Sequence, residues 1–142
     1  MTQRLISDCP VTVRIPVQWG ELDAYGHLNN TVYFRHFESA RIEYLDRCRF
    51  LEAYDRDRVG AILHSTGCRF RRPLFYPDTV IVGTRATEVE EDRFTMLYLT
   101  VSEAQDDLVA EGTGVIVSYD YVGRRPVPIP DYVREAIREL ES

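Results

Sequence analysis

The chain has 142 residues, of which 44% are hydrophobic and 28% charged, and its formal net charge is −6. This length fits one domain over residues 1–142, and the negative charge excludes the broad positive surface that sequence-independent nucleic-acid binding needs. No run approaches the roughly 20 apolar residues of a membrane helix, and residues 1–20 lack the apolar core of a secretory signal. We therefore expect a cytoplasmic domain with neither nucleic acid nor membrane as a partner.

Residues 11–19 form the first predicted element, a half-buried β-strand. Apolar and polar side chains alternate through this segment, as a strand with one buried face requires. The side that we expect to be buried carries Val11, Val13, Ile15, Val17 and Trp19. Because Pro16 has no N–H group to donate to a ladder, we expect this strand at an edge of the sheet or at a bulge.

A long amphipathic helix is predicted over residues 29–47. Its apolar side chains recur at helical spacing, and Phe34 and Leu45 widen the apolar stripe. The positions that we expect to face the core are Tyr33, Phe37, Ala40, Tyr44 and Cys48. A helix of about 19 residues is about 28 Å long, and so broad an apolar face indicates that a sheet encloses it.

The rest of the chain is predicted to contain a polar connection, four strands and a short helix. The connection covers residues 52–58, and the strands cover 61–70, 79–89, 94–102 and 108–119, each rich in β-branched or aromatic residues. Short charged turns at 90–92 and 103–107 predict that the strands they join form antiparallel hairpins. After a run of three prolines, residues 131–141 are typical of a surface helix.

These elements predict an α+β domain in which a curled antiparallel sheet of about five strands wraps around one long central helix. Strand 94–102 is apolar on both faces, with Phe94 and Met96 on one face and Leu97 and Leu99 on the other. If the helix covers one face, the other face needs a second cover. We therefore expect a homo-oligomer.

The connection between the first strand and the helix is the most informative segment. It places Asp23 just before a turn at Gly26, with Asn29 and Asn30 at the start of the helix. The N–H groups of a first helical turn lack partners inside the helix and can polarise a carbonyl group. A carboxylate beside them can act as base or nucleophile, so Asp23 is our leading catalytic candidate. The alternative is a turn residue that accepts hydrogen bonds from the backbone.

Two segments of the chain resemble hotdog-fold acyl-CoA thioesterases of the 4-hydroxybenzoyl-CoA thioesterase superfamily. One is the D-x-x-G-H-x-N-N turn at 23–30 followed by F-E-S-A-R at 37–41, and the other is R-R-P-L-F-Y-P-D at 71–78. The resemblance implies a homodimer or homotetramer with active sites between subunits and Asp23 as the catalytic carboxylate. It also implies that the backbone N–H of Asn30 binds the thioester oxygen. Glu21 stands where the commonest form of this loop has another Asp, and we assign it no catalytic role.

Further site residues are predicted in and near the same loop. The ring of His27 can contact substrate or orient Asp23, or it can simply hydrogen-bond the loop backbone. The predicted substrate-binding residues are Tyr25, Gly26, Arg71 and Arg72. Guanidinium groups match phosphate geometry, so the two arginines can grip the phosphates of coenzyme A, although a solvated strand end is an equal alternative.

No metal site is predicted from the cysteines and histidines. Cys9, Cys48 and Cys68 are odd in number and lack C-x-x-C spacing, which argues against a disulfide framework and a zinc cluster. His36, on the predicted helix, and His64, in a predicted strand, belong to no metal-binding spacing. We expect reduced, inert thiols and no metal.

The sequence therefore predicts an acyl-CoA thioesterase that hydrolyses a thioester to a carboxylic acid and free coenzyme A. Asp23 acts as nucleophile or general base, and the only cofactor is the coenzyme A that belongs to the substrate. Acyl carrier protein is an alternative carrier of the acyl group. Two other functions stay open: a hotdog acyl-CoA hydratase or dehydratase, and a non-catalytic acyl-CoA binding module.

Overall fold

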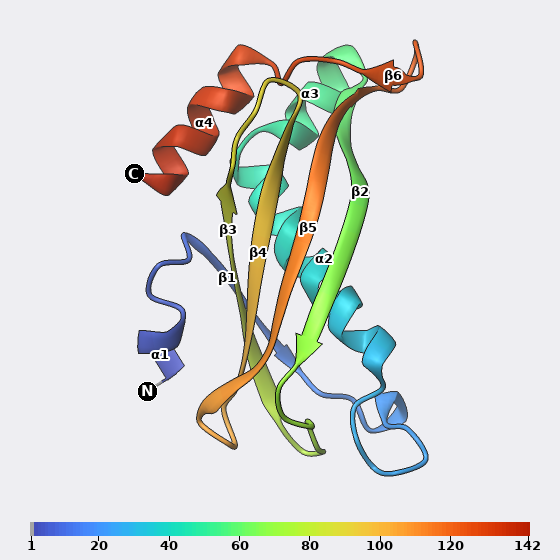
Figure 1. The fold of residues 1–142 in the computed structure, drawn as a ribbon, viewed down its shortest axis with the longest axis vertical. Coiled ribbons are helices and arrows are strands. Elements are labelled where there is room, and N and C mark those ends of the chain that lie inside the picture. Colours follow the sequence, from blue (N-terminus) through green and yellow to red (C-terminus); the bar gives the residue numbers. More distant parts are fainter. Residues whose placement is uncertain (1) are drawn as a thin grey trace.

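The computed structural model describes residues 2–142, with side chains from residue 4 onward, and its strands form a single curled antiparallel sheet (Figure 1). The strand order is β1-β3-β4-β5-β2, and the bounds are Val11–Pro16 (β1), Val59–Phe70 (β2), Thr79–Thr87 (β3), Arg93–Ser102 (β4) and Asp107–Asp120 (β5). A two-residue strand, β6 (Arg125–Pro126), pairs with β5. The predicted edge position of the first strand and the two predicted hairpins are confirmed.

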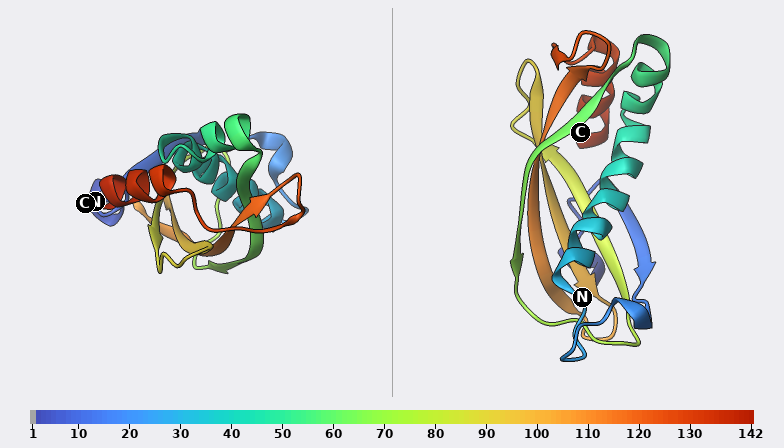
Figure 2. Two further views of the ribbon diagram at one scale, coloured as in Figure 1. Left: turned by 90° about the horizontal axis from the view of Figure 1, so that it is seen from above. Right: turned by 90° about the vertical axis from the view of Figure 1, so that its right-hand side faces the viewer.

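The long helix α2 (Asn30–Arg47) lies along one face of this sheet, and the strands curve around it (Figure 2). The other helices are α1 (Thr2–Leu5), α3 (Phe50–Asp57) and α4 (Asp131–Glu141). All five predicted core positions of α2 are buried: Tyr33, Phe37, Ala40, Tyr44 and Cys48. The predicted α+β fold, with a curled sheet around one long helix, is therefore confirmed.

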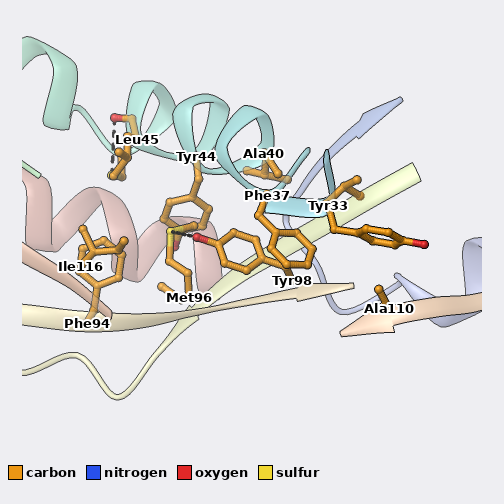
Figure 3. Close-up of a cluster of buried hydrophobic side chains, with 14 of the residues drawn as sticks. Tyr33, Phe37, Ala40, Tyr44, Leu45, Phe94, Met96, Tyr98, Ala110 and Ile116 are labelled. Atoms are coloured by element: carbon orange, nitrogen blue, oxygen red, sulfur yellow. Dashed lines mark hydrogen bonds between the residues drawn. The ribbon is translucent and has the colours of Figure 1, made fainter. Parts of the chain in front are cut away.

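One close contact sets how near α2 approaches the sheet. The ring of Phe37 stacks on the ring of Tyr98, with centroids 4.7 Å apart and planes 10° apart (Figure 3). Phe37 also lies directly over Gly112 on β5, where an added Cβ would stand only 2.3 Å from the Phe37 ring. The absence of a side chain at Gly112 therefore lets the Phe37 ring pack directly on the backbone of β5.

The predicted strand 11–19 is shorter in the structure, and its last residue was assigned to the wrong side. Strand β1 ends at Pro16, and Trp19 begins a short 3₁₀ turn over Trp19–Glu21. The Trp19 side chain is 75% exposed, whereas Val11 and Val17 are buried as expected. The alternating pattern continued past Pro16, but the chain leaves the sheet there to begin the loop that leads to α2.

The prediction of a polar connection over residues 52–58 is wrong, because most of that segment belongs to α3. Arg49 has a positive φ of 72°, which ends α2 and redirects the chain before α3 begins at Phe50. Phe50 and Ala53 bury one face of α3, and Glu52 forms ion pairs with Arg49 and Arg56 on the exposed face. Three- and four-residue spacings of this kind are helical, but the charged composition of a short segment obscured them.

The outer face of the sheet receives part of its cover from the chain itself. The backbone of Gly83 on β3 lies against Ile6 and Cys9, which belong to the segment between α1 and β1. Leu97 and Leu99 are only half-buried and line a hollow of about 450 Å³ on this face. A second subunit is therefore not the sole possible cover, and the oligomeric state stays a prediction.

The three cysteines are free thiols, as predicted. Burial raises the pKa of Cys48 to about 12 and those of Cys9 and Cys68 to about 11, which makes all three poor nucleophiles. Separately, none of the helices within residues 2–142 is long and apolar enough to span a membrane.

Replacing Gly112 with Ala should lower the free energy of unfolding by about 1–3 kcal/mol, because the new methyl group would overlap the Phe37 ring. Urea denaturation measures this change. Gly67→Ala on β2 is the matched control, since its Cβ would meet Thr113 at an ordinary 3.9 Å. Equal stability of the two variants would show that the helix–sheet contact is not tight at Gly112.

Candidate active site

The loop between β1 and α2 is anchored by backbone hydrogen bonds at both ends. Leu22 and Leu28 form an isolated antiparallel bridge that closes the loop, and the buried Leu28 fixes it to the core. The Leu28 N–H donates to the carbonyl of Leu74 at 2.9 Å, and Leu74 is fully buried. The loop is therefore held against the segment that follows β2, at the end of the molecule where α2 begins (Figure 1).

Within this loop, the carboxylate of Asp23 is held by backbone donors. Its Oδ1 accepts hydrogen bonds from the N–H groups of Tyr25, at 2.8 Å, and His27, at 3.1 Å. Gly26 has a φ of +78°, a conformation that suits glycine and lets the chain turn back on Asp23. The bond from His27, and then the bond from Tyr25, lower the pKa of the Asp23 carboxyl below its ordinary value of 3.8. Asp23 is therefore ionised at neutral pH.

The first turn of α2 presents an unpaired backbone donor. Asn29 is the N-cap, and its side chain accepts a hydrogen bond from the Thr31 N–H at 3.0 Å. The carbonyl of Asn29 accepts from the Val32 N–H, also at 3.0 Å. Among residues 2–142, no hydrogen bond engages the Asn30 N–H. This N–H group is therefore available to a carbonyl oxygen.

Asp23 and Asn30 line the same cleft, which has a volume of about 350 Å³. The loop, the start of α2 and the end of β2 form its walls, and the full lining is Asp23, His27, Leu28, Asn29, Asn30, Tyr33, Phe70, Arg72 and Pro73. Tyr33 and Phe70 meet edge to face, with ring centroids 5.0 Å apart, and give the cleft an apolar wall. Asp23, which carries the carboxylate, Asn30, whose N–H group is free, and this apolar wall thus border one cleft.

The two arginines predicted to bind substrate take different positions. Arg72 lines the cleft, and its guanidinium pairs with Asp107 at 3.0 Å, whereas Arg71 lies outside the lining and pairs with Glu111 at 2.9 Å. All four side chains are between 39% and 57% exposed. Exposed ion pairs of this kind contribute about 0–1 kcal/mol, so an anionic ligand could replace either carboxylate at little cost.

The remaining loop candidates contact Asp23 through their backbone rather than through their side chains. The His27 ring packs edge to face on Phe75, with centroids 5.2 Å apart. The Tyr25 side chain is 85% exposed, and Gly26 stands beside it in the turn, with neither residue in the lining of the cleft. The backbone alternative for His27 therefore has direct geometric support, and contact of Tyr25 and Gly26 with substrate stays a prediction.

Helix α2 carries three further polar side chains that do not line the cleft. Glu38 and Arg41, three residues apart on the helix, form an ion pair at 3.8 Å, and Arg41 also donates to the Tyr98 hydroxyl at 3.1 Å. His36 is buried, and neither ring nitrogen has a hydrogen-bond partner within residues 2–142. Burial lowers the pKa of the His36 imidazole, which favours its neutral form.

Sequence reasoning missed Phe70 and Pro73 as lining residues of the cleft. Both belong to the segment from the end of β2 through Pro73, which only the folded sheet brings beside α2. The R-R-P-L-F-Y-P-D segment was the one signal that pointed to this region. No cluster of three or more His, Cys, Asp or Glu side chains in the described part of the chain is arranged to hold a metal ion.

Several known proteins that are similar to this chain carry the name esterase or thioesterase. The family model of the thioesterase-like superfamily matches residues 17–137. A curated Aquifex aeolicus protein named "Putative esterase" is 35% identical over 95 residues, which are 66% of this chain and 74% of that protein.

Two solved structures share the whole architecture. A Thermus thermophilus thioesterase, crystallised with coenzyme A and Zn, is 32% identical with a TM-score of 0.83, and the match covers 94% of this chain and 96% of that chain. The structure of a predicted thioesterase from Bacillus stearothermophilus is 26% identical with a TM-score of 0.82, covering 91% and 94% of the two chains.

We expect the Asp23 carboxyl to titrate with a pKa below 3.8, because the His27 and Tyr25 N–H groups stabilise its charged form. Carbon-13 NMR of the side-chain carboxyl carbon, followed against pH, measures this value. As pH falls, Asp23 should stay ionised after exposed, unbonded aspartates have become half protonated. A pKa at or above 3.8 would mean that the two backbone bonds do not hold the carboxylate in solution.

Proposed function

The chain belongs to the thioesterase-like superfamily, whose hotdog fold it has, and is a thioester hydrolase; we propose that it cleaves acyl-CoA thioesters to a carboxylic acid and free coenzyme A. One observation carries this proposal: an ionised Asp23 and Asn30, whose backbone N–H is free, line one cleft at the start of α2. The coenzyme A bound in the Thermus thermophilus thioesterase supports the same carrier here. The proposed reaction uses water and involves no metal or further cofactor.

The proposed chemistry depends on charge that develops on the thioester oxygen. As the carbonyl carbon is attacked, this oxygen becomes negative, and the Asn30 N–H at the positive end of α2 stabilises it. Asp23 either attacks the carbon, forming an acyl anhydride that water then hydrolyses, or removes a proton from an attacking water molecule. In both routes the carbon–sulfur bond breaks, and coenzyme A leaves as its thiol after taking up a proton.

The other site residues have supporting parts in this proposal. His27 holds Asp23 through its backbone N–H, and Gly26 allows the turn that makes this bond possible. Arg72, at the cleft, and Arg71, beyond it, bind the phosphates of coenzyme A by exchanging their exposed carboxylate partners for phosphate oxygens. We propose that Tyr25, which is 85% exposed in the loop, contacts the part of the substrate that extends beyond the cleft.

We further propose that the protein is a homodimer joined through β2, or a homotetramer of two such dimers, and that it acts in the cytoplasm. Strand β2 is an edge strand of 12 residues, and its exposed apolar side chains include Ile62, Leu63 and Phe70. Long apolar edge strands are templates for pairing with another chain. Because Phe70 also lines the cleft, pairing along β2 would place each cleft beside the partner subunit.

The three free thiols support the proposed cytoplasmic location, because they fit a reducing compartment.

Asp23→Asn should lower kcat for acyl-CoA hydrolysis by at least about a thousandfold, since the amide can neither attack nor accept a proton. Thiol release from short, long and aromatic acyl-CoAs measures the activity, and thermal unfolding shows whether the variant stays folded. Near-normal turnover in Asp23→Asn would exclude the proposed role of this residue. Turnover of enoyl-CoA without thiol release by the unaltered chain would instead indicate a hydratase, and binding without turnover a binding module.

Light scattering at micromolar concentration should give the mass of a dimer or tetramer, and Leu63→Lys should shift it toward the monomer. Lysine on an edge strand opposes pairing because its charge must lose water on association. Val122→Lys is the matched control, since Val122 is 76% exposed and lies in the turn between β5 and β6, outside the β2 strand. A monomeric mass for the unaltered chain would contradict the proposed assembly.

A further inference from the structure

The backbone donors at the start of α2 are almost all in use. The Asn29 N–H donates to the carbonyl of Glu21 at 2.9 Å, the Thr31 N–H to the Asn29 side chain at 3.0 Å, and the Val32 N–H to the Asn29 carbonyl at 3.0 Å. Among residues 29 to 32, only the Asn30 N–H lacks such a partner in the described part of the chain. Asn29 takes part in all three of these bonds, and two of them occupy the N–H groups of Thr31 and Val32.

The side chain of Asn29 is itself fixed in place. Its Oδ1 accepts a second hydrogen bond, from the Thr31 hydroxyl at 2.9 Å, in addition to the bond from the Thr31 N–H. Both residues are exposed, so burial does not explain why this oxygen receives two donors. Asn29 lines the cleft next to Asn30, so its cap lies within reach of a bound substrate.

We propose that Asn29 is a positioning residue of the active site, which selects the Asn30 N–H as the donor to the thioester oxygen; this inference rests on the proposed function. The Asn29 side chain occupies the Thr31 N–H, so that this group cannot bind the thioester oxygen in place of the Asn30 N–H. The cap also keeps the first turn helical. Without it, the turn frays and the Asn30 N–H moves away from the position that the oxyanion will occupy. A displacement of about 1 Å at such a group can cost about a hundredfold in rate.

The charge of the cap separates this role from ordinary helix stabilisation. Asparagine and aspartate cap helices about equally well, and a negative charge at a helix N-terminus is favourable. A purely structural cap would therefore accept Asp at position 29 with no loss. At an oxyanion site the same carboxylate would stand beside the negative charge that develops on the substrate and would disfavour the transition state. A neutral cap is thus required by the chemistry and not by the helix.

The test compares kcat, KM and thermal unfolding of variants at position 29, with an acyl-CoA that the unaltered chain hydrolyses. We expect Asn29→Asp to unfold no earlier than the unaltered chain but to lose at least about tenfold in kcat, with little change in KM. Asn29→Ser, a neutral cap, should stay within about threefold of normal kcat, whereas Asn29→Ala should lose both kcat and thermal stability. Ser39→Asp controls for charge, since Ser39 lies on the exposed face of α2, ten residues or about 15 Å along the helix from position 29.

A second pair of variants tests the bond from the Thr31 hydroxyl. Thr31→Ser keeps the hydroxyl and should keep kcat, whereas Thr31→Val keeps the shape without it and should lower kcat. Normal kcat in Asn29→Asp would overturn the positioning role alone, because Asp23→Asn would still test the proposed reaction separately. Absence of thiol release from every acyl-CoA by the unaltered chain would overturn the proposed function and this inference with it.

Discussion

The contact between α2 and the curled sheet is the constraint on which the rest of the structure depends. Phe37 lies over Gly112 and stacks on Tyr98, so the distance between helix and sheet is fixed by a ring that meets bare backbone. Because α2 is also buried at Tyr33, Ala40 and Tyr44, this contact and those along the helix together fix its first turn in space. That first turn reaches the end of β2, and the cleft between Asn30 and Phe70 follows from the packing rather than from any feature of the loop alone.

The active-site candidate shows how a small number of backbone donors can be divided between structure and chemistry. Two N–H groups of the loop donate hydrogen bonds to one oxygen of Asp23, which keeps the carboxylate charged and in place. In the first turn of the helix, the N–H groups of Thr31 and Val32 donate to Asn29, and the N–H of Asn30 stays unpaired. Two opposite needs are met side by side: a carboxylate that must stay negative, and a donor that must stay free for a negative oxygen. Neither depends on a buried charge.

Much of this arrangement could be predicted from the sequence, because it arises from local patterns. The helical period from Tyr33 to Tyr44, the alternation in the strands and the turn around Asp23 each depend on residues close together in the chain. The errors occur where the decision is tertiary. Trp19 continues an alternating pattern but lies beyond the end of the sheet, and α3 is a helix whose surface ion pairs resemble a polar loop. Phe70 lines the cleft only because β2 ends beside α2 in the folded sheet. The spacing of residues along the sequence does not show which strand end lies beside the helix.

The most direct test of this account is a crystal structure of the Asp23→Asn variant with an acyl-CoA analogue in which a methylene group replaces the thioester sulfur. We expect the ketone oxygen to lie about 2.7–3.1 Å from the Asn30 nitrogen and the amide at position 23 to face the carbonyl carbon. A ketone oxygen bound to another donor, or an acyl group lodged outside the cleft between α2 and the end of β2, would contradict it.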